Sequence, residues 1–196
     1  MVRAKYFMLL VIASLASCSS CTNANIQATK PGLIVDVFPF SLHSTAFLSS
    51  DTIPMLYTCD SSNISPPLNW TNEYNNTLSF AIIMDDPDAP MGTFVHWIVY
   101  NIPGSQRELA THIPMDSTLP NGIKQGFTSF RVIGYGGPCP PNGLHRYFFK
   151  LYALDTKLNA TAGLTKTQLI EAMKGHIQGE TELMGRYIKK RNKANK

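Results

Sequence analysis

The apolar residues of this chain gather in short runs rich in branched and aromatic side chains, a composition typical of strands rather than helices. The run LSFAIIMD, Leu78 to Asp85, is apolar on both faces and predicts a central strand covered on two sides. The run FVHWIVYN, Phe94 to Asn101, predicts its neighbour, and the eight residues between them favour antiparallel pairing. Further strands are predicted from Ile34 to Phe40, from Phe127 to Ile133 and from His145 to Leu154.

The spacing of the apolar residues changes near the end of the chain. After residue 165 the apolar residues recur at helical spacing: Leu169, Ile170, Met173, Ile177, Met184, Tyr187 and Ile188. Thr165 and Gln168 stand in the pattern of a capping box, which marks a helix start. Gly175 and Gly179 each weaken the middle by about 1 kcal/mol relative to alanine. The pattern predicts one kinked helix or two short ones, with His176 inside in a structural role, and a mainly β fold with α.

The N-terminal segment has the features of an export signal. Residues 1–17 carry two cations, a short apolar run and then small residues, and the apolar run is too short to span a bilayer. Leu15-Ala16-Ser17-Cys18 resembles a bacterial lipobox, which predicts lipidation of Cys18 and a location in the bacterial cell envelope, at the outer membrane facing the periplasm. Plain secretion is the alternative. A polar tether (18–31), a folded domain (32–190) and a basic tail (191–196) follow.

The formal net charge of +4 is set by the two ends of the chain. Between Cys18 and Ile188, ten Lys and Arg stand against 13 Asp and Glu, a net charge of −3. A nucleic-acid-binding protein places its basic residues on the folded surface, so this class is excluded. The basic tail is interpreted as solvated, and membrane contact is expected only through the N-terminal lipid.

The stretch GYGGPCPPNGLHRYFFKLYALD, Gly134 to Asp155, joins a loop rich in glycine and proline to the strand that begins at His145. His145 and Tyr147 are two residues apart and share a face at the mouth of that strand. The loop offers backbone N–H groups without bulky side chains, so loop, imidazole and phenol together can hold an anion. The alternative is a buried His and Tyr satisfied by neighbouring backbone.

Two carboxylates follow the first central strand, and His96 lies near the start of the next. A carboxylate beside an imidazole fixes the tautomer of the ring and raises its pKa, which makes the ring a better donor to an anion. If the loop that begins at Gly134 abuts this hairpin, one polar cluster is expected at the edge of the sheet, formed by Asp86, Asp88, His96, His145 and Tyr147.

DPDAP followed by HWIVYNIP, and GYGGPCPP followed by HRYFFKLYALD, resemble the two signature blocks of the phosphatidylethanolamine-binding protein family. The similarity runs from about Phe38 to Tyr187, includes SPPLNW and MKGHIQGETELMGRY, and is greatest to the bacterial, Raf-kinase-inhibitor-like branch. The resemblance implies a sandwich of antiparallel sheets with a C-terminal helix or helices on one side, and often a cis peptide bond at Ala89–Pro90. The anion pocket that it implies consists of Asp86, Pro90, His96, Gly136, Pro138, His145 and Tyr147.

Three functions remain open. The first is non-catalytic binding of a phosphate-like or carboxylate group, without a cofactor, and the second is inhibition of a kinase or peptidase partner. The third is a hydrolase that uses a metal held by His and Asp, or a Cys139–His145 pair. The His and Asp spacings match no common zinc pattern, and the sequence contains neither GxSxG nor a phosphate loop. We therefore expect binding rather than catalysis.

Cys59 and Cys139 are the only cysteines of the predicted folded domain. Bacterial relatives carry a cysteine at both places, so the resemblance predicts a disulfide between them in an exported protein. A free Cys139, six residues before His145, would instead support the Cys–His enzyme.

Overall fold

The computed structural model describes residues 40–189. The predicted signal peptide (1–17), Cys18, the tether (18–31) and the basic tail (191–196) lie outside the described residues. So do both predicted domain boundaries and nearly all of the strand predicted before residue 40. None of the helices between residues 40 and 189 is long and apolar enough to span a bilayer.

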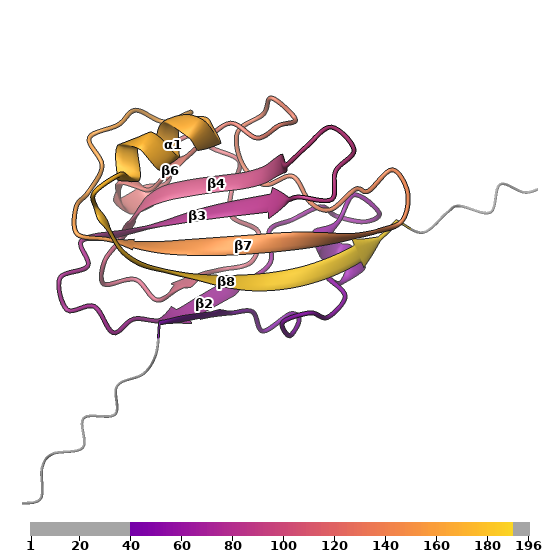
Figure 1. Cartoon of the computed structure of the whole chain (residues 1–196), viewed down its shortest axis with the longest axis horizontal. Coiled ribbons are helices and arrows are strands. Elements are labelled where there is room, and N and C mark those ends of the chain that lie inside the picture. Colours follow the sequence, from indigo (N-terminus) through magenta and orange to yellow (C-terminus); the bar gives the residue numbers. More distant parts are fainter. Residues whose placement is uncertain (1–39, 190–196) are drawn as a thin grey trace, which may run out of the picture. The chain divides into compact units, whose positions relative to one another are not determined.

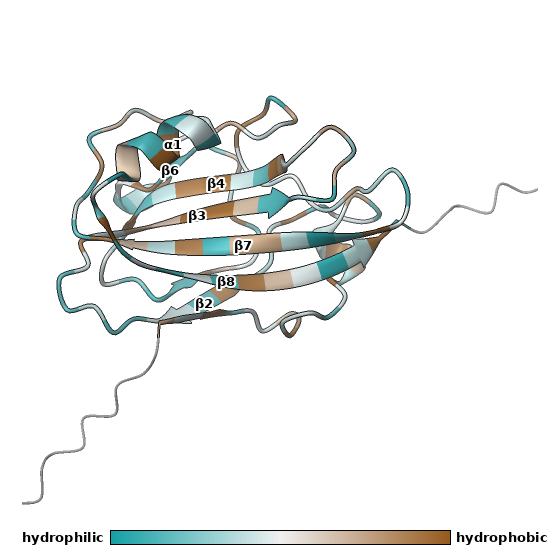
Figure 2. Ribbon diagram, in the orientation of Figure 1, coloured by the Kyte–Doolittle hydropathy of each residue, from teal (hydrophilic) through white to brown (hydrophobic). Residues whose placement is uncertain are grey.

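The larger of two antiparallel sheets has the strand order β6-β4-β3-β7-β8 (Figure 1). Its strands are β3 (Ser79–Asp86), β4 (Phe94–Pro103), β6 (Lys124–Gln125), β7 (Leu144–Leu154) and β8 (Ile177–Ile188). All eight residues of β3 are buried, which confirms the central strand predicted from the sequence. Figure 2 shows that β3 is largely hydrophobic but becomes hydrophilic at its end, where the candidate site begins.

A smaller sheet covers one face of the larger one. It consists of β1 (Ser41–His43), β2 (Leu68–Thr71) and β5 (Glu108–Leu109), in the order β1-β2-β5. Side chains of both sheets form one hydrophobic cluster, in which the ring of Trp70 lies 5.5 Å from that of Phe80. Two short 3-10 helices, η1 (Met55–Tyr57) and η2 (Pro120–Gly122), lie in the connections.

The opposite face of the larger sheet is partly covered by the helix α1 (Lys166–Met173). Leu169 and Met173 of α1 are fully buried against Ile83 and other residues of β3, β4 and β7. Burial of such a side chain contributes about 1.5–3 kcal/mol. Thr165 and Gln168 form the predicted capping box at the helix start. The structure thus confirms a β-sandwich with a helix packed on one side.

The helix expected to continue to Ile188 is wrong beyond Met173. Gly175 has a φ of +81°, which ends the helix, and β8 then pairs with the whole length of β7. Along β8 the buried residues alternate with more exposed ones, as in a strand that covers a core with one face. His176 lies in the turn before β8, and its Nδ1 is 2.9 Å from Oδ1 of Asp155.

The short strand predicted from Phe127 to Ile133 is also wrong. Phe127 and Ile133 form a single β-bridge, and the residues between them make a turn in which the N–H of Arg131 donates to the carbonyl of Thr128. Arg131 has a φ of +63°, which a continuous strand does not allow. Phe130, inside this turn, is 44% exposed and reaches the candidate site.

Candidate ligand-binding site

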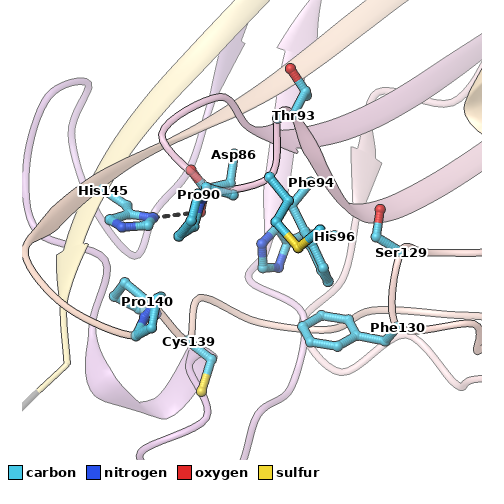
Figure 3. A pocket seen from close by; sticks show the side chains of 14 residues that line it. Asp86, Pro90, Thr93, Phe94, His96, Ser129, Phe130, Cys139, Pro140 and His145 are labelled. Atoms are coloured by element: carbon cyan, nitrogen blue, oxygen red, sulfur yellow. Dashed lines mark hydrogen bonds and ion pairs between the residues drawn. The ribbon is translucent and has the colours of Figure 1, made fainter.

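Three strand ends meet at one end of the larger sheet. The last residue of β3, Asp86, pairs with Phe94 of β4, and Asp85 pairs with Phe148 of β7. Because the neighbouring strands are antiparallel, the end of β3 lies between the beginnings of β4 and β7. This topology brings together Asp86, His96 and His145, as the sequence predicts (Figure 3).

Asp86 holds His145 in one tautomer. Nδ1 of His145 lies 2.8 Å from Oδ2 of Asp86, and only 5% of His145 and 3% of Asp86 are exposed. A carboxylate accepts and the ring donates, so Nδ1 carries the proton. Oδ1 of Asp86 accepts the backbone N–H of Asp88 at 2.9 Å, and both carboxylate oxygens are therefore engaged.

His96 is held by a backbone carbonyl rather than by a carboxylate. Its Nδ1 lies 2.6 Å from the carbonyl oxygen of Gly136 and donates to it. Burial lowers the pKa of His96, and the Gly136 carbonyl and the charge of Asp86 offset this only in part. The expectation that neighbouring carboxylates raise the pKa of His96 is wrong, because desolvation of the ring outweighs their attraction.

Asp88 does not take part in the predicted cluster. Its carboxylate forms a bidentate salt bridge with Arg146, in which Nε lies 2.9 Å from Oδ2 and Nη2 lies 2.7 Å from Oδ1. The hydrogen bond from Arg146 lowers the pKa of Asp88 to about 2. Asp88 lines a second hollow with His145, Arg146 and Arg186, and it does not line the cavity that contains His96, in contrast to its predicted position.

Tyr147 lies behind the two imidazoles rather than on the cavity wall. It is fully buried, with its ring centroid 5.2 Å from that of His96 and 6.5 Å from that of His145. Burial and the charge of Asp86 raise the pKa of Tyr147 far above its ordinary value, so the phenol stays protonated. Within residues 40–189 its hydroxyl has no hydrogen-bond partner.

Two N–H groups of the glycine-rich loop, those of Gly136 and Gly137, are not free for an anion. The N–H of Gly136 donates to the carbonyl of His96, and that of Gly137 donates to Oδ1 of Asn63. The carbonyl of Pro138 accepts from the backbone of Cys59. Gly136 and Pro138 therefore position the site from behind instead of lining it, which corrects the predicted role of the loop as a set of N–H donors.

The loop instead allows an aromatic side chain to pack closely against its backbone. A Cβ on Gly136 would lie 2.7 Å from the ring of Phe130, so glycine is needed for this approach. The rings of Phe130 and Phe94 meet edge to face at 4.6 Å, and Phe130 also contacts His96. Phe130 is not predicted as a site residue, because the composition of residues 127–133 predicts a strand where the structure has a turn.

These residues enclose a cavity of about 500 Å³. Asp86, His96 and His145 form its polar part, and of the other predicted residues only Pro90 lines it. Apolar side chains form most of the remaining wall: Ala89, Met91, Phe94, Phe130, Pro140 and Pro141. In Figure 3, His145 and Phe130 lie on opposite sides, with His96 between them and Pro140 and Cys139 along one margin. The cavity therefore combines two imidazoles with an apolar rim.

Cys59 and Cys139 form the predicted disulfide, with their Cα atoms 5.4 Å apart. Cys139 lines the cavity, but its sulfur is bonded, so the Cys139–His145 nucleophile pair is wrong. The residues from 40 to 189 contain no group of three or more His, Cys, Asp or Glu side chains that could hold a metal ion. The Ala89–Pro90 bond is trans, the form most X–Pro bonds adopt.

Comparisons with known proteins agree on one family. The family model described as phosphatidylethanolamine-binding protein matches residues 43–188. A UPF0098 protein of Methanothermobacter thermautotrophicus is 47% identical over 75% of this chain and 97% of its own length. One from Aquifex aeolicus is 44% identical over 80% of this chain and 90% of its own length.

Solved structures give the same result. The crystal structure of a putative phosphatidylethanolamine-binding protein homolog from Chlamydia trachomatis is similar with a TM-score of 0.71, at 40% identity, over 77% of this chain and 98% of that chain. The structure of YbcL from E. coli, described as a member of the mammalian PEBP family, has a TM-score of 0.72 at 31% identity, over 77% of this chain and 99% of that one.

Proposed function

Because the chain belongs to the phosphatidylethanolamine-binding protein family, we propose that it binds a phosphate-like or carboxylate group in the cavity at the end of β3, without turnover. One observation carries the proposal. His96 and His145 come from different strands and line the same cavity, while protein acceptors engage Nδ1 of both rings. The Nε2 atoms are thus left for a ligand.

The surroundings support a bound anionic group with an apolar body. The unpartnered hydroxyl of Tyr147 lies behind the imidazoles and can donate if the ligand or a water reaches it. Lys189 supplies a cation near the wall, with Nζ 3.6 Å from the sulfur of Cys139. The cavity of about 500 Å³ far exceeds the ~30 Å³ that one water occupies in the liquid, so it has room for more than an inorganic ion.

Calorimetry of the purified protein with phosphate, phosphoethanolamine and acetate tests the proposal. We expect saturable binding at one site per chain, with unaltered ligand recovered afterwards. Release of inorganic phosphate from phosphoethanolamine would show that the protein is an enzyme. A lack of binding by all three ligands would contradict anion binding in the cavity.

A second candidate function is inhibition of a kinase or peptidase partner, as in the Raf-kinase-inhibitor-like branch. The exposed rim supports it, since Met91 is fully exposed and Phe130 is 44% exposed at the cavity mouth. A photo-crosslinking side chain at position 91 tests it by capturing a partner in whole cells. The same side chain at Leu48, which is also exposed but does not line the cavity, is the control.

We further propose that the protein is a lipoprotein of the bacterial cell envelope. The motivating feature is Leu15-Ala16-Ser17-Cys18, and Ser19 rather than Asp after it favours the outer membrane. Mass spectrometry of the mature protein is expected to show residues 1–17 removed and a diacylglycerol group on Cys18. Cys18→Ser should shift the protein to the soluble fraction. Wild type found only in the soluble fraction would contradict lipid anchoring.

A further inference from the structure

The proton positions on the two cavity histidines are fixed by the groups that hold them. The Gly136 carbonyl and the Asp86 carboxylate are both acceptors, so Nδ1 of His96 and Nδ1 of His145 must each carry a proton. A neutral imidazole has only one N–H. In the neutral state the remaining nitrogen, Nε2, therefore presents a lone pair and accepts a hydrogen bond.

Both Nε2 atoms are available. Within the part of the chain that the structure describes, neither Nε2 forms a hydrogen bond, and both rings line the cavity. Two backbone donors of the adjoining loop are engaged elsewhere, since the N–H groups of Gly136 and Gly137 donate to the carbonyl of His96 and to Oδ1 of Asn63. A fully deprotonated oxyanion placed against these nitrogens would bring lone pair against lone pair.

We propose that the cavity selects oxyanions that still carry a proton, such as hydrogen phosphate or a singly protonated phosphomonoester, because Nε2 of His96, whose Nδ1–H is engaged by the Gly136 carbonyl, presents a hydrogen-bond acceptor. The inference rests on the proposed anion-binding function and specifies its ligand class. The P–OH group of the ligand donates to Nε2 of His96, and Lys189 near the cavity wall attracts the remaining, negatively charged phosphate oxygens.

The surroundings of His96 favour its neutral form. Burial lowers the pKa of His96, although Asp86, Asp85 and the Gly136 carbonyl act in the opposite direction. Around His145, Asp86 provides the paired charge, while the charge of neighbouring Asp88 is taken up by Arg146. Tyr147, whose ring packs against those of His96 and His145, stays protonated and adds no charge.

Sulfate and hydrogen phosphate separate this proposal from simple charge attraction. Both are tetrahedral dianions near pH 8, but only hydrogen phosphate has an O–H to donate. A site with an unsatisfied acceptor disfavours a ligand that lacks the matching donor. Lys189 attracts both ions alike, so it does not discriminate between them. Methyl phosphate is a third probe, because a phosphomonoester loses its last proton with a pKa of about 6.

Calorimetry at constant ionic strength with these three ions at about pH 8 and about pH 5.5 tests the proposal. At pH 8 we expect phosphate to bind at least about tenfold more tightly than sulfate or methyl phosphate. At pH 5.5 methyl phosphate should approach phosphate, and sulfate should gain affinity as protonated Nε2 becomes a donor. Sulfate binding should be accompanied by proton uptake. Measuring the binding enthalpy in two buffers of different ionisation enthalpy detects this uptake.

A variant changes the acceptor directly. His96→Gln places an amide near the position of Nε2, and the amide can turn its NH₂ toward an anion, so the preference for phosphate over sulfate at pH 8 should shrink. His176→Gln, in an exposed His–Asp pair outside the cavity, should leave the preference unchanged.

The outcomes distinguish the two proposals. Equal affinity of wild type for phosphate and sulfate at pH 8 would overturn proton selection and leave anion binding in place. Failure of all three ions to bind at both pH values would overturn both. The comparison in wild type decides the matter even if His96→Gln does not fold.

Discussion

Breaking the Cys59–Cys139 disulfide is expected to lower the free energy of unfolding by about 3–4.5 kcal/mol. The two cysteines are 80 residues apart, and closing a loop of that length restricts the unfolded chain by about 4.5 kcal/mol in the chain-entropy model, an upper figure for real bridges. Cys59→Ala is the better variant, because Cys139 lines the cavity and is left unchanged. Urea unfolding followed by tryptophan fluorescence measures the difference.

Reductant provides the control for this experiment. Wild type in reductant should unfold near the midpoint of Cys59→Ala, whereas the variant itself should be insensitive to reductant. A loss below about 1 kcal/mol in both comparisons would show that the bridge does not constrain the unfolded chain as proposed.

Replacing His145 by Ala is expected to weaken phosphate binding by about 10- to 150-fold at about pH 6. The substitution removes the ring nitrogen that we propose contacts the ligand, and a hydrogen bond to a charged group contributes about 1.5–3 kcal/mol. It also removes the partner of Asp86, so the carboxylate repels the anion more strongly. Calorimetry with phosphate measures the loss.

The chain offers a matched control for His145. His176 forms the same kind of pair with Asp155, at 2.9 Å, but is exposed and lies outside the cavity. His176→Ala should therefore leave phosphate affinity within about twofold of wild type. An equal loss of affinity in both variants would indicate a general effect of charge or stability and would contradict the placement of the ligand at His145.

The sequence predicts those parts of the fold in which one interaction dominates. β3, β4 and β7 are fully or half buried, so their side chains carry a clear apolar pattern, and the short link from Asp86 to Thr93 sets the antiparallel pairing of β3 with β4. The approach of Asp86 to His96 follows from that pairing, whereas His145 joins them because β7 pairs with the other edge of β3, which no short link imposes. The resemblance to a known family added the disulfide.

Other features depend on which of several possible partners a residue pairs with, and the pattern of residues along the chain does not reveal this. Leu183 and Tyr187, which are four residues apart, fit one face of a helix and also one face of a strand, and the open edge of β7 decides for the strand. The sequence predicts Asp88 beside His96, but Arg146 of β7 offers two donors and pairs with the carboxylate instead. The glycine-rich loop predicts N–H donors for an anion, whereas Oδ1 of Asn63, more than 70 residues away in sequence, accepts the N–H of Gly137.

The order of strands in the larger sheet has a consequence for how the chain acquires its structure. β3 lies between β4 and β7, and the contact from Asp86 to His145 spans 59 residues of sequence. During synthesis β3 can pair with β4 early, but its other edge stays open until residues 144–154 have emerged. Such long-range pairing is slow to nucleate. The site is therefore assembled only after β7 has emerged, and β8, which pairs with β7, completes the sheet later still.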